Sequence, residues 1–127
     1  MALSIAELES RLTEPHLLDS GVPLAHDAQL LFDSAMAHLE RGDIRAARCD
    51  EHGTWHAVAW VKRAILLGFR IGHVQTMPGT APFSFLDKHT YPTREFRPEH
   101  QVRIVPGGST VRRGAYLAPS VVCMPPM

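Results

Sequence analysis

Arginine is the side chain in this sequence that most often offers a charged group for binding a ligand. The 127 residues contain eleven arginines among thirteen basic residues, and a planar guanidinium binds carboxylates and phosphates through two parallel hydrogen bonds. Residues 1–51 hold ten acidic and four basic residues, whereas residues 52–127 hold three acidic and nine basic ones. This asymmetry suits a small anionic ligand in the second half. The alternative is that the opposite charges of the two halves pair within the fold or between subunits.

Arg103 has the most favourable position for such a ligand. It lies in the short apolar stretch "QVRIV" (101–105), which predicts a strand, and Pro106 follows directly. An arginine held on an anchored strand at a structural boundary is well placed to grip a carboxylate. It could equally be an exposed charge on an edge strand, and the sequence alone leaves both interpretations open. Net charge is zero, which disfavours a nucleic-acid partner.

Metal and nucleophile chemistry have weaker signals. Cys49, His52 and His56 give C-x2-H-x3-H, which is close to the spacing of zinc ligands. A fourth ligand is missing and residues 50–53 form an adequate turn, so no metal site is predicted. Cys123 has no neighbouring histidine and is expected in the core rather than as a nucleophile. The sequence contains no G-x-S-x-G, Walker, G-x-G-x-x-G or H-E-x-x-H motif.

Helices and short strands must position these residues. A capping box of Ser4 and Glu7 opens a first predicted helix, and a glycine, Gly42, is placed to end a second. The third helix is the most apolar and is expected to be buried, within the domain or between subunits, at both Leu66 and Leu67. The predicted helices cover residues 3–12, 23–43 and 57–70; a hairpin is predicted over 44–58 and strands over 73–77 and 101–105. Together they predict an α/β (α+β) N-terminal domain over residues 1–105.

A different pattern begins after Pro106. Val111, Leu117 and Cys123 follow one another at intervals of six residues, with small residues nearby. This is the rhythm of a left-handed parallel β-helix, in which three hexapeptides, about eighteen residues, form each coil and coils bury their faces by stacking. Residues 106–127 are therefore predicted to start such a helix, truncated within its first turn. Without neighbouring coils, residues 111–127 are expected to lack a stacking partner.

Five segments occur in an order and spacing that identify a family. They are "WVKRAILLGFRI" (60–71), "DK" (87–88), "VRIVP" (102–106), "VRRGAYLA" (111–118) and "MPP" (124–126). From about residue 36 to the end, the chain resembles the N-terminal part of the 2,3,4,5-tetrahydropyridine-2,6-dicarboxylate N-succinyltransferases, also called tetrahydrodipicolinate succinylases. Residues 1–35 match only in their helical character.

The resemblance implies a fold and a reaction. Members are homotrimers with an N-terminal α/β domain, a left-handed β-helix and a small C-terminal piece. They transfer succinyl from succinyl-CoA to the amino group of the ring-opened dicarboxylate, in the synthesis of diaminopimelate and lysine. The arginine that matches Arg103 binds the dicarboxylate. The catalytic carboxylates and the coenzyme A groove belong to later coils, beyond Met127, and no metal or other cofactor is implied.

Two competing functions are considered. One is a stand-alone module that binds a dicarboxylate or caps a trimer without catalysis. The other is a different hexapeptide acyltransferase, which the segments at 60–71 and 102–118 disfavour. The N-terminus lacks the basic start and apolar stretch of a signal peptide, and no apolar run reaches the roughly 20 residues of a membrane span. The two cysteines are far apart in sequence, which favours a reducing, cytoplasmic setting. Neither a membrane nor a nucleic-acid partner is expected.

Overall fold

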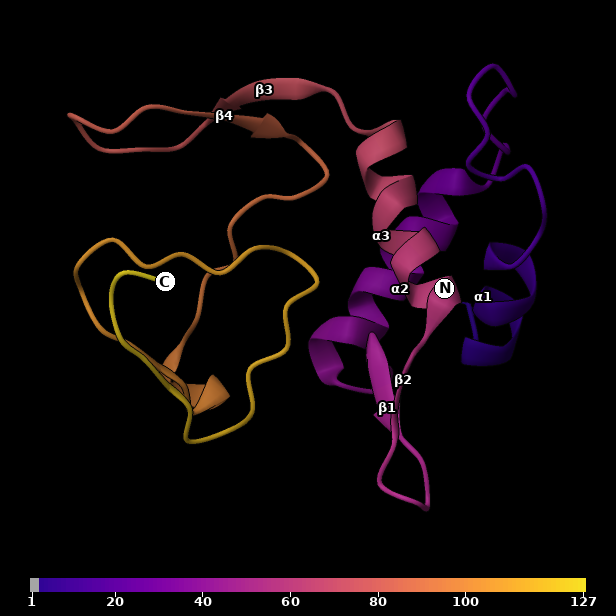
Figure 1. Ribbon diagram of the computed structural model, residues 1–127. Helices are drawn as coiled ribbons and strands as arrows, with labels where there is room; N and C mark the ends of the chain where they lie inside the picture. Colours follow the sequence, from indigo (N-terminus) through magenta and orange to yellow (C-terminus); the bar gives the residue numbers. More distant parts are fainter. Residues whose placement is uncertain (1–2) are drawn as a thin grey trace.

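Three helices form one side of the molecule, and the orange-to-yellow C-terminal segment forms a wide loop on the other (Figure 1). The computed structural model describes residues 3–127. The helices α1 (Ile5–Leu12), α2 (Ala28–Arg41) and α3 (Ala59–Ile71) lie in the segments predicted to be helical. The expected mixture of helices and short strands is confirmed, whereas these residues do not form a β-helix of stacked coils.

The helix ends follow from local chemistry. Ser4 Oγ accepts a hydrogen bond from the Glu7 N–H at 3.3 Å, and Glu7 Oε2 accepts one from the Ser4 N–H at 2.8 Å. This is the predicted capping box, which satisfies donors that the first turn of α1 leaves unpaired. α2 ends at Gly42, whose φ of 78° is the left-handed conformation that glycine adopts without strain.

The core lies between the three helices. Both α1 and α3 pack against α2, and they also contact each other. The apolar residues of α2 that recur at helical spacing, which are Ala28, Leu31, Phe32, Ala35 and Leu39, all face this core. The buried apolar side chains of the helices are Leu8, Leu12, Ala28, Leu31, Phe32, Ala35, Met36, Leu39, Trp60, Val61, Ala64 and Leu67.

The apolar helix α3 is buried on one side only. Leu67 is fully buried, but its neighbour Leu66 is 43% exposed and Phe69 is 40% exposed. The expectation that α3 is buried within the domain at Leu66 as well as Leu67 is therefore wrong, whereas burial of this face between subunits stays a prediction. α1 and α2 cover one face of α3. On the other face the Tyr91 ring contacts Phe69, with the ring centroids 4.7 Å apart, and Leu66 remains exposed.

Gly68 marks the closest approach between α3 and its neighbours. A Cβ atom built at Gly68 would overlap the Phe32 ring and the Tyr91 hydroxyl group. Tyr91 is held in this place because its hydroxyl donates a hydrogen bond of 2.5 Å to the Ile65 carbonyl. Glycine is thus required here by space, although alanine has the higher helix propensity.

We expect Gly68→Ala to lower the free energy of unfolding by about 1–3 kcal/mol, because overpacking outweighs the gain in helix propensity. Leu66→Ala on the open face of the same helix is the control, and it should stay within about 1 kcal/mol of the parent. Urea denaturation followed by circular dichroism measures both. A Gly68→Ala variant as stable as the parent would show that α2 and α3 are farther apart than described.

Two antiparallel hairpins extend from the helices (Figure 1). β1 (Ala47–Cys49) pairs with β2 (Trp55–Ala57), as predicted. β3 (Val74–Met77) was also predicted, but its partner β4 (Phe85–Lys88) was not. The prolines at 78 and 82 and the absence of a clear period conceal β4 in the sequence. No helix of the described residues is long and apolar enough to cross a membrane.

The C-terminal loop is closed by a parallel strand pair. β5 (Arg103–Ile104) lies beside β6 (Val122–Cys123), and a short 3₁₀ helix (Pro98–His100) precedes β5. The expectation that residues 111–127 lack a partner is therefore wrong. β6 pairs with the strand around Arg103, which precedes the six-residue rhythm and for that reason was not included in it. Residues 111–113 are bonded to residues 92–94.

Candidate dicarboxylate-binding site

The backbone around Arg103 is fixed by the parallel strand pair. The Arg103 N–H donates to the Val121 carbonyl at 3.0 Å, and the Val105 N–H donates to the Cys123 carbonyl at 3.0 Å. Arg103 stands opposite Val122, and Ile104 stands opposite Cys123. The predicted strand thus exists and has hydrogen bonds on both sides of Arg103.

Side chains alternate between the two faces of this pair. Cys123 is buried and Ile104 is half-buried, so this pair of residues faces the inside of the loop. Arg103 and Val122 are exposed and therefore face outward. Cys123 is a core residue, as predicted. The guanidinium of Arg103 is carried on the open face of a fixed strand.

Arg103 differs from the other arginines in the five segments that carry the resemblance. Among residues 3–127, no ion pair or side-chain hydrogen bond involves Arg103. Each of the other four donates to a group of the chain: Arg63 to the Leu12 and Glu14 carbonyls, Arg70 to the Leu17 and Val22 carbonyls, Arg112 to Asp87, and Arg113 to Asp33. Those four arginines hold the fold together, whereas Arg103 is left accessible to an anion.

The opposite charges of the two halves pair in part within the fold. Arg113 contacts Asp33 at 2.8 Å, and Arg94 lies 3.7 Å from Glu40. These contacts join the C-terminal loop to α2. The alternative interpretation of the charge asymmetry is therefore correct for Arg94 and Arg113, but it does not account for Arg103.

The zinc-like pattern is explained by a turn. Asp50 Oδ1 accepts hydrogen bonds from the N–H groups of His52 and Thr54, each at 2.9 Å, and Asp50 Oδ2 lies 2.7 Å from His56 Nε2. The hydrogen bond from His56, followed by those from the backbone, lowers the pKa of Asp50 below its ordinary value. Within residues 3–127, no group of three or more histidine, cysteine or acidic side chains is arranged to hold a metal.

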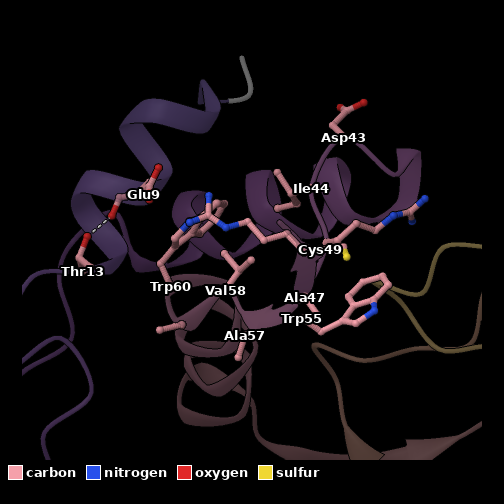
Figure 2. A pocket seen from close by; sticks show the side chains of 13 residues that line it. Glu9, Thr13, Asp43, Ile44, Ala47, Cys49, Trp55, Ala57, Val58 and Trp60 are labelled. Carbon is pink, nitrogen blue, oxygen red and sulfur yellow. Dashed lines mark hydrogen bonds between the residues drawn. The ribbon is translucent and has the colours of Figure 1, made fainter. Parts of the chain in front are cut away.

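A large hollow of the described surface lies away from Arg103. It is a groove of about 740 Å³ between α1, the β1–β2 hairpin and the start of α3, with Trp55 and Cys49 at one end and Glu9 and Thr13 at the other (Figure 2). Its polar groups are largely used by neighbours: Arg45 stacks on Tyr116 at 3.8 Å, and Asp43 accepts from Arg41 at 2.8 Å. Size alone would select this groove, but its polar groups do not converge on a ligand.

A second hollow of about 430 Å³ separates the β3–β4 hairpin from the C-terminal loop. The ion pair between Asp87 and Arg112 lies in its wall, and Tyr91 is at its floor. Burial raises the pKa of Tyr91 to about 12, so the hydroxyl that binds the Ile65 carbonyl stays protonated at neutral pH. Tyr91 is a structural donor here rather than an acid or base for catalysis.

Comparison with known proteins finds the family that the sequence segments resemble. Residues 16–71 match the family model described as "Tetrahydrodipicolinate N-succinyltransferase N-terminal". The chain matches the N-terminal part of this family. The resemblance predicted from the sequence is confirmed. It reaches further toward the N-terminus than the predicted start near residue 36, because it includes the connection between α1 and α2 and the first half of α2.

Individual tetrahydrodipicolinate N-succinyltransferases agree. A relative from Paramagnetospirillum magneticum, named 2,3,4,5-tetrahydropyridine-2,6-dicarboxylate N-succinyltransferase, is 32% identical over 130 residues, which cover 97% of this chain and 46% of the relative. A relative of the same name from Xylella fastidiosa is 41% identical over 92 residues, which cover 68% of this chain and 32% of the relative. The chain thus spans less than half the length of these curated relatives.

Proposed function

We propose that this chain is the substrate-gripping N-terminal part of a tetrahydrodipicolinate N-succinyltransferase, and that Arg103 binds one carboxylate of the substrate. The observation that carries the proposal is the contrast among the arginines of the recognised segments. Four of them are used by the fold, and Arg103 stands exposed on a fixed strand without a partner among residues 3–127. Its two-pronged geometry suits a carboxylate.

The reaction defines what the chain must supply. The substrate amine attacks the thioester carbonyl of succinyl-CoA, and the new C–N bond forms as the C–S bond breaks. A general base takes a proton from the amine and passes it to the coenzyme A sulfur, so that coenzyme A leaves as the thiol. Arg103 holds the dianionic acceptor in place, which lowers the entropic cost of the encounter. The general base and the coenzyme A groove are assigned to residues beyond Met127. No metal or other cofactor takes part.

The architecture is part of the same proposal. The chain consists of an α/β domain over residues 1–105 and the start of a left-handed β-helix over 106–127. Support comes from the parallel pairing of residues nineteen apart, close to the roughly eighteen residues of a three-hexapeptide coil. Further coils would stack on β6, three copies would form a homotrimer, and the enzyme would work in the cytoplasm. The pathway it serves is the synthesis of diaminopimelate and lysine.

A chimaera tests the proposed function. In the chimaera, residues 1–127 replace the matching part of the Paramagnetospirillum relative. This relative is chosen because its alignment covers 97% of this chain. The chimaera is expected to release coenzyme A thiol from succinyl-CoA only when tetrahydrodipicolinate is present. A folded chimaera that binds the dicarboxylate without releasing thiol would instead support the non-catalytic module. A folded chimaera that acylates a different amine would support another acyltransferase.

A further inference from the structure

The backbone just before Arg103 has an unusual conformation. Gln101 has φ 54° and ψ 32°, in the left-handed region that a side chain with a Cβ atom seldom adopts. It ends the short 3₁₀ helix, and its N–H donates to the Pro98 carbonyl at 3.0 Å. Only Val102 separates this corner from Arg103. Conformations of this kind persist where the surrounding structure holds them, and they are concentrated at functional sites.

A second corner of the same kind lies on top of the first. Ser120 has φ 72°, and its N–H donates to the Gln101 carbonyl at 2.8 Å. Ser120 follows Gln101 by nineteen residues, which is also the separation of Arg103 and Val122 in the paired strands. The two left-handed corners therefore belong to the same register as the strands, and each strand leaves its corner in the same direction.

We propose that Gln101 is a positioning residue for Arg103, acting through its left-handed backbone. The corner sets the direction in which the strand leaves, and the strand sets the direction of the Arg103 side chain. If the corner opens, Arg103 still carries its charge but no longer faces the carboxylate. This inference rests on the proposed function for the ligand, while the link between corner and strand can be measured without any ligand.

A substitution series at Gln101 tests the corner. Glycine adopts the left-handed conformation freely and isoleucine strongly disfavours it, so Gln101→Gly should keep the corner and Gln101→Ile should open it for most of the time. The probe is pyridine-2,6-dicarboxylate, titrated into the 127-residue chain and followed by backbone amide NMR. The apparent Kd rises as the competent fraction falls. We expect about a tenfold rise for Gln101→Ile and less than about a twofold change for Gln101→Gly.

Matched controls separate positioning from general loss of structure. Gln75→Ile places the same substitution in β3, where isoleucine fits a strand, and should leave the Kd unchanged. In an Arg103→Ala background, Gln101→Ile should have no further effect, because the corner acts through Arg103. Additive effects of the two substitutions, or equal effects of glycine and isoleucine at position 101, would overturn the proposal. If Gln101→Ile disturbs the helical amides, Gln101→Ala replaces it, with an intermediate rise expected.

Hydrogen exchange distinguishes failure of this inference from failure of the proposed function. Gln101→Ile should speed exchange of the Arg103 and Val105 amides, which are bonded across to β6, relative to Gln101→Gly. If Arg103→Ala binds the probe as well as the parent, the carboxylate grip is wrong, and exchange alone decides whether the corner orders the strand. Unchanged exchange in Gln101→Ile would overturn the positioning role whatever the ligand result.

Discussion

Leu67→Asp is expected to lower the stability of the chain by the largest amount of any substitution considered, so that it unfolds at urea concentrations at which the parent is still folded. Leu67 is fully buried in the helical core, and a carboxylate there has neither water nor a counter-charge. The loss of the leucine contacts adds to the cost of the buried charge, giving about 4–5 kcal/mol in total. This is a large part of the roughly 5–15 kcal/mol by which domains are stable. Thermal and urea unfolding followed by circular dichroism measure the loss.

The next residue along the helix supplies the control. Leu66 is 43% exposed, so a carboxylate at this position can remain hydrated. Leu66→Asp should therefore cost no more than about 1 kcal/mol in the isolated chain. Comparable losses in the two variants would mean that α3 is rotated about its axis relative to the described packing, or that its outer face is covered in solution.

The helices could be predicted because their signals are local. The capping box at Ser4, the helical spacing of apolar residues in α2 and the left-handed Gly42 are each contained within a few turns of chain. The open face of α3 could not be predicted in the same way. A composition that is apolar on most sides does not say which side the neighbouring helices cover, and Leu66 lies on the uncovered one.

Pairings distant in sequence were the main omissions. β4 is a short strand in a proline-rich region, without alternation of exposed and buried residues, and its assignment depends on β3 across the hairpin. The pairing of β6 with β5 joins residues that are nineteen positions apart and lies partly outside the six-residue rhythm. Local patterns carry no direct signal for such contacts, so the tail was expected to lack a partner that it has.

The candidate site, too, could be predicted from the sequence only in part. The residue type, the strand and the resemblance all point to Arg103 in the sequence. What the sequence could not show is that Arg112 and Arg113 are engaged by Asp87 and Asp33, because those pairs form only when the C-terminal loop packs on the hairpin and on α2. The contrast between engaged and unengaged arginines requires the tertiary structure.

Arg103→Ala is expected to abolish most of the dicarboxylate specificity of the assembled enzyme. Loss of one partner of a desolvated charge pair costs about 2–5 kcal/mol, which corresponds to a fall of about two orders of magnitude or more in kcat/KM for the dicarboxylate. Arg103→Lys keeps the charge but loses the two-pronged geometry, so its kcat/KM should lie between those of the parent and the alanine variant. Arg48→Ala, which removes an exposed arginine from β1, is the control and should have no effect.

Steady-state kinetics of the chimaera, with both substrates varied, test this account most directly. For Arg103→Ala, kcat/KM for tetrahydrodipicolinate should fall by about a hundredfold or more, while the KM for succinyl-CoA stays close to the parent value. That result would assign Arg103 to the dicarboxylate. Unchanged dicarboxylate kinetics, or a defect confined to succinyl-CoA, would contradict the account and remove Arg103 from the substrate site.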